Sequence, residues 1–292
     1  LDPEGVEELE LGELAELRRS RVELSYEDEA SIDEPTAPQA RILVHAQGET
    51  HCGRLRPKNE DRLLVAADHS LFAVADGMGG HRGGEVASEL AVRTLDSAYR
   101  QHDFQGSIDS STPVPRRGRD LALAMQMTNH AVHAQAAAEP ALHEMGTTLV
   151  VARFSPRKQR VYIGHVGDSR CYRIRNGHIR QLTRDHTLAS VGVVGPNEHH
   201  LVRAIGIEPS VTIDLIVDRP EPDDVYCLCS DGLPKMLTDQ EICDLVSSEL
   251  DLEAAVYSLI GLANDRGGLD NITVVLVQVT ESASSALSAL AG

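Results

Sequence analysis

The chain of 292 residues contains no tryptophan, and aromatic side chains make up only 3% of it, so any core must be mainly aliphatic. No apolar run is long enough to span a membrane, and no charged and then apolar signal segment opens the chain. The five cysteines are an odd number without paired CxxC spacing, which disfavours a disulfide framework and a zinc knuckle. We therefore expect a protein of the reducing cytoplasm with no membrane span.

Positive charge is also scarce. Lys and Arg number 27 against 45 Asp and Glu, which gives a formal net charge of -18. Nucleic-acid binding needs clustered Lys and Arg, so no nucleic-acid partner is expected.

The acidic residues are concentrated at the N-terminus, where residues 1–40 hold thirteen acidic and three basic side chains. This composition predicts an acidic N-terminal arm and linker, partly disordered, with one short amphipathic helix around Val6 to Leu17. The alternative is an arm that folds over a basic patch or recruits a partner. A second predicted boundary leaves residues 281–292 as a C-terminal tail, so that residues 41–280 form one large domain.

Short β-branched or apolar runs bounded by Gly, Pro, Asn or Asp follow residue 41, as in strands. Asn176-Gly177 between alternating segments predicts a tight hairpin. Consecutive hairpins followed by helices favour an α+β fold with antiparallel sheets covered by helices. The predicted strands are 41–47, 62–67, 71–75, 147–154, 160–166, 171–175, 211–217, 225–230 and 272–279, and the predicted helices are 84–100, 119–138, 238–249 and 251–264, with Gly84, Thr238 and Asp251 as start signals for three of them.

Three distant acidic turns each join a carboxylate to a predicted strand: Asp76-Gly77, Asp231-Gly232 and Asp270-Asn271. Carboxylates brought together there would repel by about 4 kcal/mol per pair at 4 Å and an effective dielectric near 20. A cation must then lie between them, and oxygen-only ligands suit Mg²⁺ or Mn²⁺. The glycines after Asp76 do not have dinucleotide-binding spacing, and no Cys-x5-Arg loop supplies a cysteine nucleophile.

Seven ordered motifs carry a family resemblance: RPKNED (56–61), ADGMGGHRGGEVAS (75–88), MGTTLVV (145–151), GHVGDSR (164–170), LTRDHT (182–187), CSDGL (229–233) and GGLDNITVV (267–275). Together they resemble the bacterial type of the metal-dependent serine/threonine phosphatases of the protein phosphatase 2C-like family, over about residues 48–279. The resemblance implies a sandwich of two antiparallel β-sheets flanked by α-helices on both outer faces, with residues 41–280 as the catalytic domain.

The same resemblance implies a site with two Mn²⁺ or Mg²⁺ ions. In it Asp76 bridges the ions, Asp231 and Asp270 complete the ligands of one, and Glu60 with the carbonyl of Gly77 those of the other. Asp61 would orient water, and Arg56 would clamp phosphate. The implied reaction is hydrolysis of phosphoserine and phosphothreonine on proteins by a metal-bridged hydroxide, without a phosphoenzyme.

Two positions depart from the family pattern. Met78 stands where some members have a histidine proposed as general acid, which leaves His81 or a water for that role. Lys235 stands where many relatives have an aspartate that joins Asp168 at a third metal. Lys235 is then either a solvated surface lysine, or its ammonium replaces the third ion and pairs with Asp168.

Residues 188–205 correspond to the family's flap beside the active site, and their Gly and Pro content predicts a mobile loop. His199 and His200 within it are expected to be exposed to solvent and not to bind metal. Phosphorylated proteins, made by a cognate serine/threonine kinase, are the expected partners. Two alternatives stay open: a catalytically weak binding module with this fold, and a phosphatase dedicated to one signalling partner.

Overall fold

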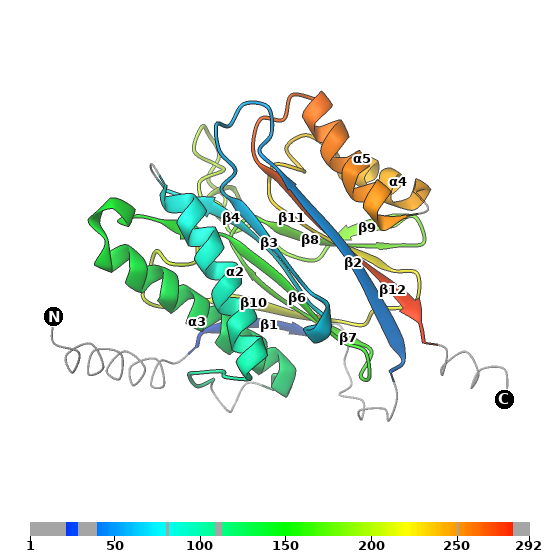
Figure 1. Cartoon of the computed structure of the whole chain (residues 1–292), viewed down its shortest axis with the longest axis horizontal. Helices are drawn as coiled ribbons and strands as arrows, with labels where there is room; N and C mark the ends of the chain where they lie inside the picture. The colour runs from blue at the N-terminus through cyan, green and yellow to red at the C-terminus, as the bar shows by residue number, and fades with distance from the viewer. Residues whose placement is uncertain (1–21, 29–39, 80–81, 109–112, 250, 283–292) are drawn as a thin grey trace.

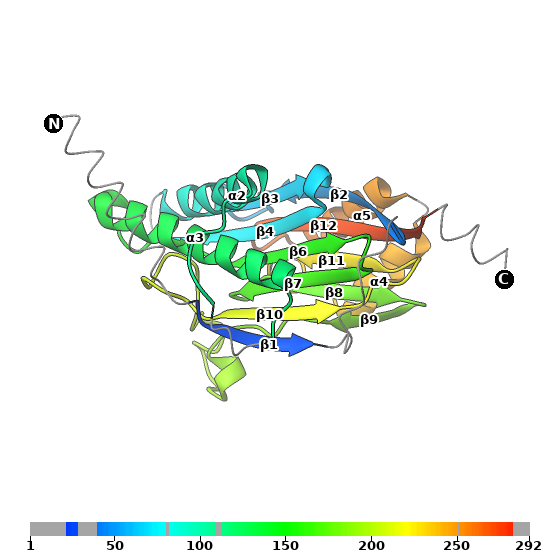
Figure 2. The same cartoon turned by 90° about the horizontal axis from the view of Figure 1, so that it is seen from below.

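The computed structural model of the chain describes residues 22–28, 40–79, 82–108, 113–249 and 251–282. Two β-sheets pack face to face, and a pair of helices covers the outer face of each (Figure 1). Helices α2 (Gly83–Gln101) and α3 (Arg116–Ala138) lie on one side, with α4 (Asp239–Ser248) and α5 (Leu252–Asp265) on the other (Figure 2). The predicted α+β sandwich is therefore confirmed.

The first sheet has the strand order β1-β10-β7-β6-β4-β3, with β5 paired to β4. Its pairs are antiparallel except β1 with β10, which is parallel. The strands are β1 (Leu24–Asp28), β3 (Asp61–Ala66), β4 (Leu71–Met78), β5 (Gly146–Thr147), β6 (Leu149–Ser155), β7 (Arg160–Val166) and β10 (Ile213–Asp218).

The second sheet has the order β2-β12-β11-β8-β9, and all its pairs are antiparallel. Its hairpin turns at Asn176 and Gly177, whose φ angles of 51° and 71° are those of the predicted tight turn. The strands are β2 (Ile42–His51), β8 (Arg170–Arg175), β9 (His178–Gln181), β11 (Val225–Cys229) and β12 (Ile272–Glu281).

Central strands are buried on both faces, which explains their nearly continuous hydrophobicity. In β4, Leu71 and Ala73 face α2 and α3, while Phe72 and Val74 face the other sheet. On β11, Cys227 and Cys229 point together toward α4 and α5, where they behave as small buried hydrophobes. Alternation on the strands thus produces three apolar layers from one chain.

Predicted helix starts agree with the structure at two of three places. Thr238 accepts a hydrogen bond from the backbone N–H of Glu241 in a capping box, and Asp251 caps α5. Gly84 is not the start of α2, which begins one residue earlier after Arg82 with no side-chain cap. Gly84 instead allows the backbone of α2 to lie close to Gly77. Short 3-10 helices lie between β3 and β4 at Ala67–His69, between α3 and β5 at Pro140–Leu142, and between β9 and β10 at Ala189–Val191.

One segment of the predicted N-terminal arm belongs instead to the folded domain. Residues 24–28 form β1 beside β10, and Val22 is buried with its N–H bonded to the carbonyl of Ser107. The apolar side chains of Leu24 and Tyr26 pack against the α2 and α3 layer, in alternation with polar neighbours. The prediction of a linker there was wrong because high negative charge obscured this two-residue alternation. Residues 1–21, 29–39 and 283–292 lie outside the described residues, so the rest of the arm and the tail stay predictions.

Among the described residues, no helix combines the length and the apolar character required to cross a membrane.

Candidate active site

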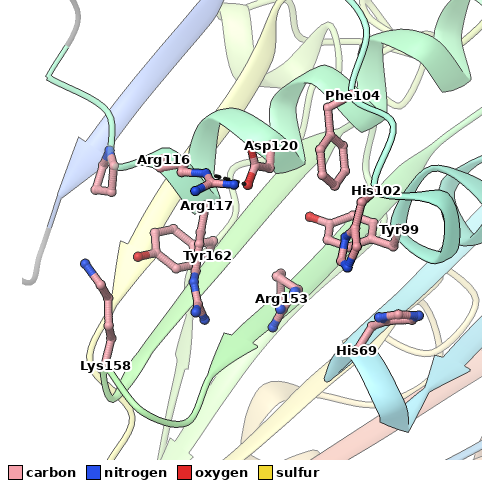
Figure 3. Close-up of a pocket in the computed structure, with 11 residues that line it drawn as sticks. His69, Tyr99, His102, Phe104, Arg116, Arg117, Asp120, Arg153, Lys158 and Tyr162 are labelled. Carbon is pink, nitrogen blue, oxygen red and sulfur yellow. Dashed lines mark ion pairs between the residues drawn. The ribbon is translucent and has the colours of Figure 1, made fainter. Parts of the chain in front are cut away.

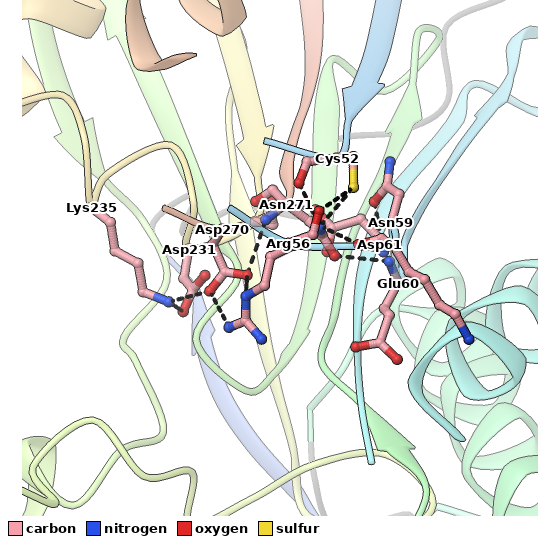
Figure 4. Close-up of polar contacts among 11 residues, drawn as sticks. Cys52, Arg56, Asn59, Glu60, Asp61, Asp231, Lys235, Asp270 and Asn271 are labelled. Atoms are coloured by element: carbon pink, nitrogen blue, oxygen red, sulfur yellow. Dashed lines mark hydrogen bonds and ion pairs between the residues drawn. The ribbon is translucent and has the colours of Figure 1, made fainter. Parts of the chain in front are cut away.

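The acidic turns predicted from the sequence meet at one edge of the sandwich. They line a cleft of about 640 Å³ together with Arg56, Lys235 and part of the 188–205 segment. Figure 4 shows the side chains from the loop before β3, from the turn after β11 and from the start of β12 converging there. We call five carboxylates at this edge the acidic cage: Glu60, Asp76, Asp168, Asp231 and Asp270.

Asp61 lies behind the cage and has no exposed surface. It stands directly opposite Asp76 in the β3 and β4 pair. Its Oδ2 accepts hydrogen bonds of 2.7 Å from the hydroxyls of Ser230 and Thr273, but its Oδ1 is buried without a hydrogen-bond partner. Burial raises the pKa of Asp61 to about 6, although the two hydroxyls oppose the shift.

Asp76 follows the buried residues 71–75 of β4. Thr148 fixes its backbone: the Asp76 N–H donates to the Thr148 hydroxyl at 3.0 Å, and the Thr148 N–H donates to the Asp76 carbonyl at 2.8 Å. Burial raises the pKa of Asp76 well above its usual value, and the charges of the surrounding carboxylates raise it further, Asp61 and Asp231 most of all. An anion in this position is strongly destabilised unless a cation lies beside it.

Asp168 follows Gly167 in the turn between β7 and β8. His186 holds this turn in place through two hydrogen bonds to Gly167. Its Nδ1 accepts from the Gly167 N–H at 3.0 Å, and its backbone N–H donates to the Gly167 carbonyl at 2.8 Å. Burial, and then the charge of Asp231, raises the pKa of Asp168 to about 7. In the absence of a metal ion, a fraction of the molecules therefore carries a protonated Asp168 at neutral pH.

Lys235 lies inside the acidic cage. Its Nζ is 2.5 Å from Oδ2 of Asp231 and 2.9 Å from Oδ2 of Asp270. Burial alone would lower the pKa of Lys235, but these two carboxylates raise it. Neither alternative for Lys235 holds as stated: the side chain is 42% exposed, as on a surface, but its ammonium is ion-paired, and the partners are Asp231 and Asp270, not Asp168.

Arg56 makes a two-point contact with Asp270. Its Nε is 2.9 Å from Oδ1 of Asp270, and its Nη2 donates to Oδ2 at 2.9 Å. Burial alone would raise the pKa of Asp270, but Lys235 and then Arg56 outweigh it, so the pKa lies below its usual value. The Arg56 side chain is 52% exposed, so its guanidinium can also turn toward a ligand in the cleft.

The backbone at Gly77 is too crowded for any side chain. A Cβ at Gly77 would lie 2.0 Å from the carbonyl oxygen of Gly84 and 2.7 Å from that of Glu60. A Cβ at Gly84 would lie 2.8 Å from the Gly77 carbonyl. Both glycines are therefore required for α2 to begin beside β4, which keeps the Gly77 carbonyl next to the Glu60 side chain.

These features agree with a site for hard divalent cations. The Oδ1 of Asp231 is buried without a hydrogen-bond partner, as is that of Asp61. Burial raises the pKa of Asp231 even though the Lys235 ammonium opposes the shift. The cleft's anionic donors are all carboxylates, without a cysteine, which suits Mg²⁺ or Mn²⁺ better than soft metals. Candidate ligands are the cage carboxylates and the Gly77 carbonyl.

Sequence reasoning gave no role to Asn271, which holds the cage together. Its Nδ2 donates to the carbonyls of Cys52 at 2.9 Å and Lys58 at 2.8 Å, while its Oδ1 accepts from the N–H of Glu60 at 2.8 Å. It thus ties the loop that carries Arg56 and Glu60 to the start of β12. Only its position directly after Asp270 could have indicated this role from the sequence. Ser230, Thr273 and Thr148, which hydrogen-bond to Asp61 or to the backbone of Asp76, were also given no role.

The 188–205 segment borders the cleft. His199 and His200 line it and are exposed, as predicted. Val191 and Val194 are also exposed, the latter at 90%. Met78 lines the cleft and has no proton to donate, and His81 lies outside the described residues.

Comparison with known proteins points to one family. The family model described as Protein phosphatase 2C matches residues 48–257. The serine/threonine phosphatase stp of Listeria welshimeri is 37% identical over 249 residues, which are 80% of this chain and 96% of that protein. The serine/threonine protein phosphatase PstP of Mycobacterium tuberculosis is 35% identical over 254 residues, 82% of this chain and 46% of that protein.

Solved structures agree with the sequence comparison. The catalytic domain of PstP in complex with two manganese ions superposes with a TM-score of 0.70 at 34% identity, covering 82% of this chain and 100% of that one. The serine/threonine phosphatase Stp1 of Staphylococcus aureus gives a TM-score of 0.71 at 29% identity, covering 84% and 98%.

Proposed function

The chain belongs to the protein phosphatase 2C family, and from this we propose that it hydrolyses phosphoserine and phosphothreonine on proteins with the help of divalent cations. One observation carries the proposal: carboxylates from separate segments meet in one cleft, where burial and mutual repulsion raise the pKa of Asp76 well above its usual value. Bound divalent cations would relieve that repulsion with the carboxylates ionised, and the same cations would attract a phosphoryl group.

In our proposal Asp76 would hold two ions, Asp231 and Asp270 would complete one ligand set, and Glu60 with the Gly77 carbonyl the other. Asp168 would serve as a further ligand at the cleft. Bound ions of this kind supply Lewis acidity and lower the pKa of water. The two manganese ions of the similar PstP domain support the count, and either Mn²⁺ or Mg²⁺ suits the oxygen donors.

Arg56 is the proposed phosphate clamp, because a planar guanidinium can hold two phosphoryl oxygens. It must exchange its contact with Asp270 for the substrate, and its half-exposed side chain permits this. Asp61 is proposed to orient water held by the ions. It stands opposite Asp76 in the strand pair, and its Oδ1 is buried without a hydrogen-bond partner.

Lys235 favours two ions over three, because it stands where many relatives place the carboxylate of a third site, and an ammonium cannot bind a cation. Its contacts in the metal-free protein are with Asp231 and Asp270, which we assign to one of the two ions, so that ion must displace the ammonium when it binds. We propose that no third ion binds.

The substrates we propose are phosphorylated proteins, with a cognate serine/threonine kinase acting in opposition. Val191 and Val194 are exposed in the same 188–205 segment as His199 and His200, which line the cleft, and we propose that this segment contacts the protein around a phosphorylated residue. A phosphatase dedicated to one partner uses the same chemistry and is a narrower form of the same proposal. We place the protein in the cytoplasm because its five cysteines are free thiols, of which Cys52 is partly exposed.

Phosphate release from a phosphothreonine peptide with Mn²⁺ tests the proposal. Asp231→Asn should lower the rate by about a hundredfold or more, because it removes a metal ligand. Asp244→Asn, an exposed aspartate on α4, is the matched control and should keep the wild-type rate. Equal rates for wild type and Asp231→Asn would refute the site. A wild-type protein that also fails to hydrolyse p-nitrophenyl phosphate would indicate the binding-module alternative.

A further inference from the structure

A second cavity, of about 590 Å³, lies at the opposite end of the first sheet (Figure 3). Four cationic side chains line it, Arg116, Arg117, Arg153 and Lys158, against a single carboxylate, Asp120. We call it the basic cavity. Such a cluster stands out in a chain with a formal net charge of -18.

The basic cavity is separate from the acidic cage. Arg153 pairs with Leu71 at the beginning of β4, whereas Asp76 lies five residues further along the same strand. At about 3.3 Å per residue the two sites are roughly 16 Å apart. A ligand in one does not contact the other.

Arg153 reaches the cavity with its charge only partly compensated. Its guanidinium lies 5.8 Å from the centre of the Tyr99 ring and donates to the carbonyl of Phe154, and within the described ranges it forms no ion pair. Burial lowers the pKa of Arg153. Neighbouring Arg117 donates to the hydroxyl of Ser155, which carries no charge. An anion bound here would stabilise both cations.

Tyr99 supplies a second, independent sign of a missing ligand. Its side chain is buried, with only 4% of the residue exposed, yet its hydroxyl has no hydrogen-bond partner. In Figure 3 the hydroxyl points into the space between Asp120 and Arg153. Buried polar groups without partners are uncommon in folded proteins, and one that lines a cavity marks a place for a ligand atom.

We infer that the basic cavity binds a phosphate-type dianion, either inorganic phosphate or a phosphate monoester. Two arginines and the Tyr99 hydroxyl offer donors to several oxygens at once, which a tetrahedral phosphoryl group satisfies better than a halide or a lone carboxylate. The first turn of α3, which begins at Arg116 without a side-chain cap, adds N–H groups at a positive helix end. The Asp120 carboxylate repels any anion in the cavity, so a dianion, which is attracted more strongly by the cations, is favoured over a monoanion.

Two sources can provide this group: free phosphate, and a phosphorylated side chain on a protein. Calorimetry separates them. The Mg²⁺-loaded full chain would be titrated with sodium phosphate, and separately with a peptide that carries a non-hydrolysable phosphonate analogue of phosphoserine. An Arg56→Ala background removes the proposed phosphate clamp of the cleft. Ions bound in the cleft still attract phosphate, so binding at the basic cavity is identified by its loss in variants of that cavity.

In this background Arg153→Gln should weaken binding at least tenfold, which is about 1.4 kcal/mol. Lys158→Gln, in the turn between β6 and β7, is a second variant with little risk to folding, and it should weaken binding several-fold. The control is Arg93→Gln, which removes the same charge from an exposed position on α2 outside the cavity.

Binding of phosphate alone would identify a free phosphate site, and binding of the peptide alone would identify a docking site for phosphorylated protein. Either result supports the inference if Arg153→Gln and Lys158→Gln reduce it and Arg93→Gln does not. Equal dissociation constants in all three variants, or no binding of either probe in the Arg56→Ala background, would overturn it. The test measures binding and not hydrolysis, so its outcome is independent of the proposed activity.

Discussion

Replacement of Lys235 by methionine tests how the acidic cage is neutralised before metal binds. The ammonium bridges Asp231 and Asp270 at 2.5 and 2.9 Å. A divalent ion held by these two aspartates must displace it, so the metal-free protein contains its own competitor. Methionine keeps an unbranched side chain that is one atom shorter and removes the charge, and we therefore expect tighter metal binding.

The size of the effect follows from burial. Two unit charges at 4 Å interact by about 4 kcal/mol at an effective dielectric of 20. The Lys235 side chain is 42% exposed, however, and exposed ion pairs are measured at about 1 kcal/mol or less each. We expect the two contacts together to oppose metal binding by about 1 to 2 kcal/mol, so Lys235→Met should lower the Kd for Mn²⁺ roughly five- to thirtyfold.

Isothermal titration of Mn²⁺ into the metal-free full chain measures this Kd directly. Lys158→Met is the matched control, because it removes a lysine at the far end of the first sheet and should leave the Kd unchanged. The Tm of the metal-free Lys235→Met protein should also fall, since the cage carboxylates then repel one another without a counter-charge, and Mn²⁺ should restore it. An unchanged or weaker affinity for Mn²⁺ would show that the ammonium does not compete for the site.

Three further results are expected. Gly77→Ala should lower the Tm by about 4 °C or more, because its Cβ would lie 2.0 Å from the Gly84 carbonyl; Gly261→Ala, with open space around the new methyl group, should not, and calorimetric melting of both variants decides. Asp168 should make the metal-free protein less stable to urea as pH rises from about 4 to about 7, because its pKa is raised to about 7 in the folded protein, which therefore binds more protons than the unfolded chain. Asp168→Asn should remove this contribution, on the order of 1 to 4 kcal/mol over that pH range. An identical pH dependence in the variant would count against the raised pKa. Lys235→Asp should bind one more Mn²⁺ per chain than wild type in equilibrium dialysis, whereas an unchanged stoichiometry would mean that the lysine does not exclude a third ion.

Local features of the sequence predicted most of the fold. Alternating or continuous apolar runs located nine strands, because side-chain direction in a strand repeats every two residues regardless of distant partners. The Asn176-Gly177 turn and the caps at Thr238 and Asp251 are also local, since their hydrogen bonds form within a few residues. Leu24 to Asp28 carried the same alternation, but composition alone could not distinguish a charged edge strand from a linker.

The residue types of the candidate site were likewise readable, because Asp76, Asp231 and Asp270 each follow or precede a predicted strand and were therefore expected at a sheet edge. Their partners were not readable. Asn271 binds the carbonyls of Cys52 and Lys58, more than two hundred residues away, and such contacts depend on how the two sheets close over each other.

The sequence by itself determined the strands, the helix caps and the set of acids that a divalent ion needs, because each depends on neighbouring residues and on the chemistry of single side chains. Only the tertiary structure decided that Lys235 pairs with Asp231 and Asp270, that Asp61 is buried behind Asp76, and that cations from α3, β6 and the turn after it line one cavity together with Tyr99. The physical reason is that charge interactions act through space and vary with burial, and neither distance nor burial is fixed until the sheets and helices have packed together.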